Sequence, residues 1–210
     1  MDRIYELKKE VAFTMRRLYE RKLTTATGGN TSCRCGNIML ITPSSIDKAT
    51  LTADQIAEVD IETGENLTPE FRLSIESEMH RKVYEVNGDV MAICHSHPTT
   101  ASLFSALENP IRSDLIAESW YLLGEVVKVP YALMGTQRLA DNVAEYASRY
   151  TTMLLENHGA LATGKSLLNA FDRLEVLEQT AQMTLMLGEK LVQSPLGPDR
   201  MKEIDSVYKS

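Results

Sequence analysis

The sequence predicts a single α/β domain in which several hairpin-connected strands are covered by helices. Apolar residues recur at spacings of three and four in the first segment, which is typical of a helix. Short apolar runs then alternate with further helical segments, and turn residues separate the two kinds. A chain of 210 residues with 43% hydrophobic residues is also long enough to bury one substantial core.

The N-terminal part is expected to form one helix followed by short strands. From Ile4 to Leu18 the apolar residues fall on one face, and the helix they predict ends near Leu23, ahead of TTATGGNTS. Residues 31–45, TSCRCGNIMLITPSS, predict a hairpin with its turn at CGN. Residues 57–61, AEVDI, predict a further strand.

Helices and strands alternate through the rest of the chain. Further helices are predicted at residues 74–87, 99–109, 138–150 and 165–189. Further strands are predicted at residues 90–97, 124–132 and 151–159, and Pro130 interrupts the second of them. We expect one domain over residues 1–195 and a short polar tail over residues 196–210.

The charge balance excludes some functions. With 22 basic and 29 acidic residues the net charge is −7, which argues against non-specific nucleic-acid binding, although a local pocket can still bind an anion. No run approaches the ~18 apolar residues of a membrane span, and the N-terminus lacks the apolar stretch of a signal peptide. Cys33, Cys35 and Cys94 are expected to be ordinary reduced cysteines of a cytoplasmic protein.

Three of the four histidines lie where apolar runs end. His95 and His97 close VMAICHSH, and residues i and i+2 of a strand point to the same face, so both rings can aim at one point. His158 closes TTMLLENHG, with Gly159 behind it to let backbone approach closely. Three protein ligands are typical of catalytic zinc. These histidines therefore predict a metal site, against the alternative of satisfied polar residues at strand ends.

The nearby helix supplies candidates for proton transfer. Glu76 and Glu78 lie near its start, but helix positions i and i+2 face different ways, so only one of them can face a metal. The pattern alone does not choose between the two. His80, four residues after Glu76, is expected to be structural or at the surface.

Three sequence signatures together resemble the class II aldolase and adducin-head family, which includes enzymes of the L-fuculose-phosphate aldolase and L-ribulose-phosphate 4-epimerase type. They are TGGNTS with ITPSS, the helix start SIE, and HSHP followed by ENHGALATG, in this order over roughly residues 5–190. The resemblance implies a compact α/β fold on a mainly antiparallel sheet, a bound Zn²⁺ and a homotetramer with sites at subunit interfaces.

The resemblance also implies roles for particular residues. His95, His97 and His158 match the zinc ligands, and Glu76 matches the glutamate that is both a zinc ligand and the catalytic acid/base. The residues matching the phosphate-binding segments are Gly29, Asn30, Thr42, Ser44, Ser45 and Ser74. Backbone amides with Asn and Ser donors can form an anion nest that needs no cationic side chain.

Two positions depart from the family pattern. Ile75 stands where many aldolases have a second serine, which removes a hydroxyl donor. Ile116 falls about where the fuculose-type aldolase has a catalytic tyrosine, so that role passes to Tyr121 or to Tyr208, which could reach a neighbouring subunit.

The resemblance therefore predicts a zinc-dependent aldolase that cleaves a ketose 1-phosphate to dihydroxyacetone phosphate and a short aldehyde through a zinc-stabilised enediolate. Glu76 would carry the proton to or from carbon. A sugar-phosphate 4-epimerase, a dehydratase and a sugar-acid-phosphate decarboxylase are alternatives on the same site. A non-catalytic, adducin-like binding module is the alternative from a different class.

Overall fold

The computed structural model describes residues 3–187 and 193–208, and its centre is one seven-stranded sheet. The strands lie in the order β3-β2-β1-β4-β7-β6-β5. They are β1 (Asn30–Cys35), β2 (Ile38–Ile41), β3 (Ala57–Asp60), β4 (Ala92–Ser96), β5 (Val127–Val129), β6 (Thr152–Leu155) and β7 (Gly159–Gly164). Every neighbouring pair is antiparallel except β5 and β6, which are parallel. The prediction of a mainly antiparallel α/β domain is confirmed.

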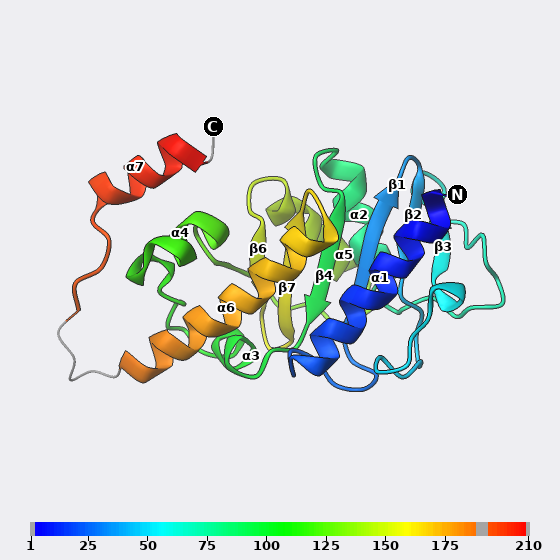
Figure 1. The fold of residues 1–210 in the computed structure, drawn as a ribbon, viewed down its shortest axis with the longest axis horizontal. Helices are drawn as coiled ribbons and strands as arrows, with labels where there is room; N and C mark the ends of the chain where they lie inside the picture. Colours follow the sequence, from blue (N-terminus) through cyan, green and yellow to red (C-terminus); the bar gives the residue numbers. More distant parts are fainter. Residues whose placement is uncertain (1–2, 188–192, 209–210) are drawn as a thin grey trace.

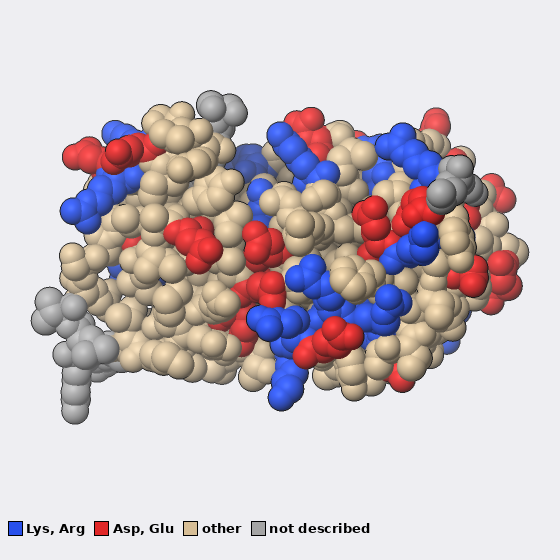
Figure 2. All heavy atoms as spheres, in the orientation of Figure 1, with Lys and Arg blue, Asp and Glu red and all other residues tan. Residues whose placement is uncertain are grey.

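Helices cover both faces of the sheet, so the domain has three layers. One face packs against α1 (Arg3–Glu20), α3 (Thr99–Ser105) and α6 (Leu167–Leu187), and the other against α2 (Ser77–Val86) and α5 (Gln137–Ala147). Figure 1 shows α1 and α6 crossing in front of the strands, with α2 and α5 behind them. Acidic and basic side chains are interspersed over the face that carries α1 and α6 (Figure 2).

The alternation of side chains along β4 decides which layer each residue joins. Ala92 and Cys94 pack into the core under α1 and α6, whereas Ile93 packs into the core under α2 and α5. His95 follows Ile93 by two residues and therefore points toward the α2 side. The strand thus places the first histidine of HSH on the layer that also carries Glu76.

Pairing within the sheet brings three distant segments together at one place. Asn30, the first residue of β1, is opposite His95 of β4. On the other side of β4, Ala160 of β7 is opposite Ser96. The turn between β6 and β7, which contains His158, therefore lies beside the end of β4.

Several predicted elements differ in extent. The strand expected at 124–132 is limited to β5, and the one expected at 151–159 ends at Leu155, so that His158 lies in a turn. The helix expected at 165–189 is α6, and its last two predicted residues lie outside the described ones. Elements that were not predicted are β7, α4 (Ala117–Leu123) and two 3₁₀ turns at Ala53–Gln55 and Ser113–Leu115.

The segment expected to be a tail contains a helix. Helix α7 (Pro198–Tyr208) packs against α4, where the indole Nε1 of Trp120 donates to Asp205 Oδ1 at 3.0 Å. The rings of Tyr121 and Tyr208 lie 4.8 Å apart between centroids. None of the side chains of α7 is buried, and the last two residues of the predicted tail lie outside the described part of the chain.

Among the described residues, no helix combines the length and the apolar character that crossing a membrane requires.

Candidate functional site

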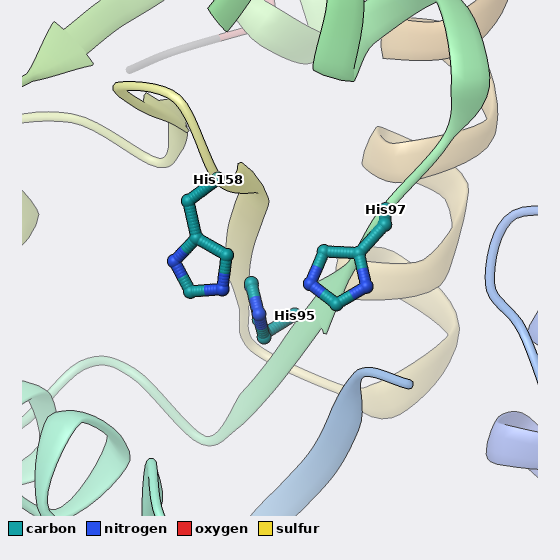
Figure 3. A group of neighbouring side chains, drawn as sticks. All are labelled: His95, His97 and His158. Atoms are coloured by element: carbon teal, nitrogen blue, oxygen red, sulfur yellow. The ribbon is translucent and has the colours of Figure 1, made fainter. Parts of the chain in front are cut away.

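Three imidazole rings meet where β4 ends and the β6–β7 turn begins. His95 is in β4, His97 follows the strand directly, and His158 lies in the turn, where its backbone N–H donates to Leu155 O at 3.0 Å. Figure 3 shows the three rings facing a common space. Their ring centroids are 4.8 to 5.4 Å apart, and one ligand atom of each lies within 4.8 Å of the others.

Glycines make this convergence possible. A Cβ on Gly159 would lie 2.5 Å from Cδ2 of His97 and 2.7 Å from the carbonyl oxygen of Ser96, so a side chain there would displace the ring. Gly29 has a φ of +64°, and a Cβ there would lie 2.6 Å from the carbonyl oxygen of His95. The close backbone approach that the sequence predicted at Gly159 is therefore present, and Gly29 provides a second one.

The histidines offer nitrogens that suit a metal ion. Nδ1 of His95 lies 2.9 Å from Ala160 O, which accepts the ring N–H and leaves Nε2 with a free lone pair. Nε2 of His95 and of His97 are buried without a hydrogen-bond partner among the described residues. Burial and the neighbouring His95 and His158 lower the pKa of His97 to about 3, so that its ring is neutral, as a metal ligand must be. The donor set fits a bound transition-metal ion.

Glu76 completes this group, and Glu78 does not. The Glu76 side chain is buried, with Oε2 3.3 Å from His95 Nε2 and Oε1 3.1 Å from His158 Nε2. Burial alone would raise its pKa, but the interactions with the nearby imidazoles of His95 and His158 outweigh burial and lower it. Glu78 instead pairs with Arg81 at 2.6 Å.

Asn30 and Ser74 hold the Glu76 carboxylate from the other side. The amide Nδ2 of Asn30 donates to Glu76 Oε2 at 2.8 Å and to Ser74 Oγ at 3.1 Å. Ser74 Oγ in turn accepts from the backbone N–H of Glu76 at 3.3 Å. Two residues predicted to bind phosphate therefore also fix the orientation of the carboxylate.

A cavity of about 430 Å³ opens beside the histidines. It is lined by Thr27, Gly28, Gly29, Asn30, Pro43, Ser44, Lys48, Ser74, Ile75, Glu76, His97, Met134, Asn157 and His158. Four of the six predicted phosphate-binding residues are among them. The other two are Thr42, whose Oγ1 accepts from the backbone of Thr31 at 3.1 Å, and Ser45, which lies next to Ser44 with 3.3 Å between their hydroxyls.

Lys48 is a lining residue that the sequence reasoning missed. Its side chain is 1% exposed, although lysine is almost never fully buried unless it is paired. A lysine six residues after Thr42 in a polar loop is expected to be exposed, so the sequence did not indicate that it is buried.

The predicted tyrosines lie elsewhere. Tyr121 and Tyr208 contact each other and line a separate cavity between α4, α6 and α7. Ile116 precedes α4 and is also absent from the lining of the histidine cavity. Among the described residues no tyrosine lines that cavity, whereas Ile75 does and is half exposed.

His80 belongs to a neighbouring polar cluster and not to the histidine group. It is fully buried, with Nδ1 2.7 Å from Ser32 Oγ, and the same hydroxyl lies 2.9 Å from the Tyr84 hydroxyl. Burial and the nearby His95 lower its pKa to about 3. Of the two roles expected for His80, the structural one is confirmed.

The sequence and the fold of this chain are similar to those of a known protein family. Residues 9–185 match the family described as Class II Aldolase and Adducin N-terminal domain. The L-fuculose phosphate aldolase of Methanococcus maripaludis is 31% identical over 173 residues, which cover 82% of this chain and 93% of the relative. The 3-oxo-tetronate 4-phosphate decarboxylase of Pectobacterium atrosepticum is 33% identical over 179 residues, covering 83% and 81% respectively.

A solved L-fuculose 1-phosphate aldolase has the same fold. It superposes with a TM-score of 0.88 at 32% identity, covering 98% of this chain and 97% of its own.

Proposed function

We propose that this chain, which belongs to the class II aldolase and adducin family, is a zinc-dependent aldolase that cleaves a ketose 1-phosphate into dihydroxyacetone phosphate and a short aldehyde. The observation that carries the proposal is the convergence of three histidines and one buried carboxylate beside a cavity that is lined by glycines and by hydroxyl side chains. Such a set combines metal ligands, an acid/base and donors for an anion in one place.

His95, His97 and His158 would hold the metal ion, with Glu76 as a further ligand before substrate binds. A bound Zn²⁺ would supply Lewis acidity toward a substrate carbonyl group. The protein's part is to fix the ligands. The Ala160 carbonyl sets the ring of His95, and the glycines beside His97 leave it room.

Glu76 is the residue we assign to proton transfer. Its side chain lines the cavity, so a substrate bound there would lie within reach of the carboxylate. The Asn30 amide donates to Oε2, whereas Oε1 receives no donor from Asn30 and lies 3.1 Å from Nε2 of His158. Oε1 is therefore the atom we expect to carry the proton.

A decarboxylase is the second candidate function. The aldolase and the decarboxylase reactions form the same three-carbon enediolate. Cleavage of a ketose 1-phosphate between C3 and C4 leaves the electron pair on a three-carbon enediolate and releases an aldehyde. Loss of the carboxyl group of 3-oxo-tetronate 4-phosphate leaves the same enediolate and releases carbon dioxide. In both reactions, protonation of the enediolate at the carbon whose C–C bond was broken gives dihydroxyacetone phosphate. The observation that favours the decarboxylase is a cavity lined by no tyrosine of the described chain, because release of carbon dioxide needs no acid/base at the departing oxygen.

In the aldolase proposal, a second copy of the chain supplies the tyrosine that the histidine cavity lacks. Tyr121 and Tyr208 line a different cavity of their own chain, and both are substantially exposed, at 41% and 63%. We propose that the protein is a homo-oligomer, a tetramer by analogy with the family, in which a tyrosine of one subunit completes the site of the next.

Product analysis tests the proposal and separates the candidates. Purified protein is incubated with L-fuculose 1-phosphate and, separately, with 3-oxo-tetronate 4-phosphate. Dihydroxyacetone phosphate is measured by reduction with a coupled dehydrogenase, and carbon dioxide is measured directly. An aldolase forms the triose phosphate and an aldehyde from the first compound, whereas a decarboxylase forms the triose phosphate and carbon dioxide from the second.

Two variants test the assignment of the acid/base. Glu76→Gln keeps the size and the hydrogen bond from Asn30 but removes the base, so turnover should fall by about 10²- to 10⁴-fold. Glu78→Gln, on the same helix but paired with Arg81, should leave turnover nearly unchanged. A Glu76→Gln protein that keeps most of its activity would refute the assignment. Turnover of neither compound, in protein without bound metal, would favour the binding module.

A further inference from the structure

Lys48 lies in the loop after β2 with its ammonium group held inside the protein. The side chain is 1% exposed, and Nζ donates to Pro43 O at 3.1 Å. Among residues 3–187 and 193–208, no carboxylate lies within ion-pair distance of Nζ. One carbonyl oxygen is a weak substitute for water around an ammonium group.

The position of Lys48 places this charge at the segments predicted to bind phosphate. Its backbone N–H donates to Ala26 O at 2.8 Å, which ties the loop after β2 to the loop that precedes β1. Gly28 and Gly29 of that second loop line the same cavity as Lys48, and so does Ser44. Two glycines, a serine and Lys48 from these two loops therefore line the same cavity.

The side chains around the cavity do not supply the missing negative charge. Glu76, the one carboxylate in the lining, is already bound by Asn30 and lies against His95 and His158. The histidines are neutral or positive. A ligand that enters the cavity is the remaining source of an anion for Lys48.

We propose that Lys48 provides the positive charge that binds the phosphate group of the substrate, together with the backbone amides near Gly29. The proposal rests on the proposed function, and it changes one expectation from the sequence, namely a phosphate nest without a cationic side chain. A charge-assisted contact in a site shielded from water is stronger than a neutral hydrogen bond. The site should therefore discriminate strongly between phosphorylated and neutral ligands.

The alternative is that Lys48 only ties its own loop to Pro43. Two variants separate these roles. Lys48→Gln keeps a donor for the Pro43 carbonyl and loses the charge, and Lys48→Met keeps the length and loses both. If the charge matters, the two variants should lose phosphate affinity to a similar extent. If the loop contact matters, Lys48→Gln should behave like the wild type.

Lys128 offers a matched control. Its Nζ also donates to a backbone carbonyl, that of Leu107, but its side chain is only partly buried and it lines a different cavity. Lys128→Gln removes a comparable lysine without touching the histidine cavity.

The experiment uses the full chain loaded with zinc and measures binding rather than turnover. Dihydroxyacetone phosphate is titrated by calorimetry, and dihydroxyacetone, its neutral counterpart, by ligand-observed NMR. The affinity of both Lys48 variants for the phosphate should fall by about ten- to a hundredfold, as expected for losing a charged partner. Affinity for the neutral ketone, the zinc content and the Lys128→Gln results should stay within twofold of the wild type.

Three outcomes would overturn the proposal. If Lys48→Gln binds the phosphate like the wild type, or if both ligands lose affinity equally, Lys48 has a structural role and the proposed function stands. If the wild type binds the two ligands equally well, the phosphate site itself is wrong, and with it both the role of Lys48 and the phosphorylated substrate of the proposed function.

Discussion

A lysine that binds an anion from inside the protein should destabilise the protein when the anion is absent. Burial lowers the pKa of Lys48 from 10.5 to about 8. This difference corresponds to about 3 kcal/mol of unfavourable free energy for keeping the ammonium charged in the folded state at pH 7. Lys48→Met removes this cost and also removes the hydrogen bond to Pro43 O, which contributes about 1 kcal/mol. The variant should therefore be more stable than the wild type by about 2 kcal/mol at pH 7.

The pH dependence of this difference follows from the direction of the pKa shift. In the folded protein Lys48 loses its proton near pH 8, whereas in the unfolded chain it keeps the proton until about pH 10.5. Between these values the unfolded state binds more protons, so the stability of the wild type rises with pH relative to the variant. The advantage of Lys48→Met should be complete below pH 8 and should disappear by about pH 10.

Urea denaturation of both proteins at pH 7 and pH 10 measures this difference. Both are kept in a chelator and without phosphate, so that neither metal nor anion contributes to stability. Adding phosphate at pH 7 should then stabilise the wild type more than the variant, because a ligand that binds only the folded state raises its stability with concentration. A variant that is less stable at pH 7, or a difference that is the same at both pH values, would refute the reasoning.

Three further predictions concern the metal ligands, a buried carboxylate outside the site, and the contact between subunits. His97→Ala should bind less zinc than the wild type, which elemental analysis measures, and equal metal content in the two proteins would contradict the site. Glu178→Gln should lower the free energy of unfolding by about 1–3 kcal/mol in urea, because the buried Glu178 carboxylate accepts hydrogen bonds from the two backbone N–H groups of Thr100 and Ala101 at the start of α3. Substitution of the exposed neighbour, Gln179→Ala, should have little effect. Inactive Tyr208→Phe and Glu76→Gln proteins, unfolded and refolded together, should recover activity at about a quarter of their sites if Tyr208 acts in a neighbouring subunit, and no recovery would contradict that role.

The histidine group could be predicted because its signal is local. His95 and His97 occupy positions i and i+2 at the end of an apolar strand, and such positions point to the same face. This prediction needs no information about contacts with the rest of the chain. The choice between Glu76 and Glu78 was harder. Helix geometry shows that the two point in different directions, but the direction toward His95 depends on how α2 packs against the sheet, which is a long-range contact. The family pattern supplied that choice, and the structure places Glu76 beside His95.

What could not be predicted was set by packing between distant segments. Four of the six residues of strand β7, GALATG, are glycine or alanine, which have low strand propensity, and the segment is extended because it lies buried between β4 and β6. Helix α7 has a polar sequence and no buried side chain, so its sequence carries little apolar periodicity. The loop that contains Lys48 is tied to Ala26, 22 positions earlier in the chain, by a backbone hydrogen bond that no local pattern of the loop indicates.

The positions of Tyr121 and Tyr208 link the oligomeric state of the protein to the type of reaction proposed for it. The compounds named for the two relatives share the fragment that becomes dihydroxyacetone phosphate, and in this chain His97, His158, Glu76 and Lys48 line one cavity. Aldol cleavage needs one thing more than decarboxylation, namely a group that exchanges a proton with the oxygen of the departing aldehyde. Within the described chain no tyrosine lines the cavity, and Tyr208 is exposed and packs against Tyr121 where α7 contacts α4. A monomer would therefore have the groups for decarboxylation and lack one for aldol cleavage. An active aldolase that sediments as a monomer would break this link, and it would require a different proton donor among the residues that line the cavity.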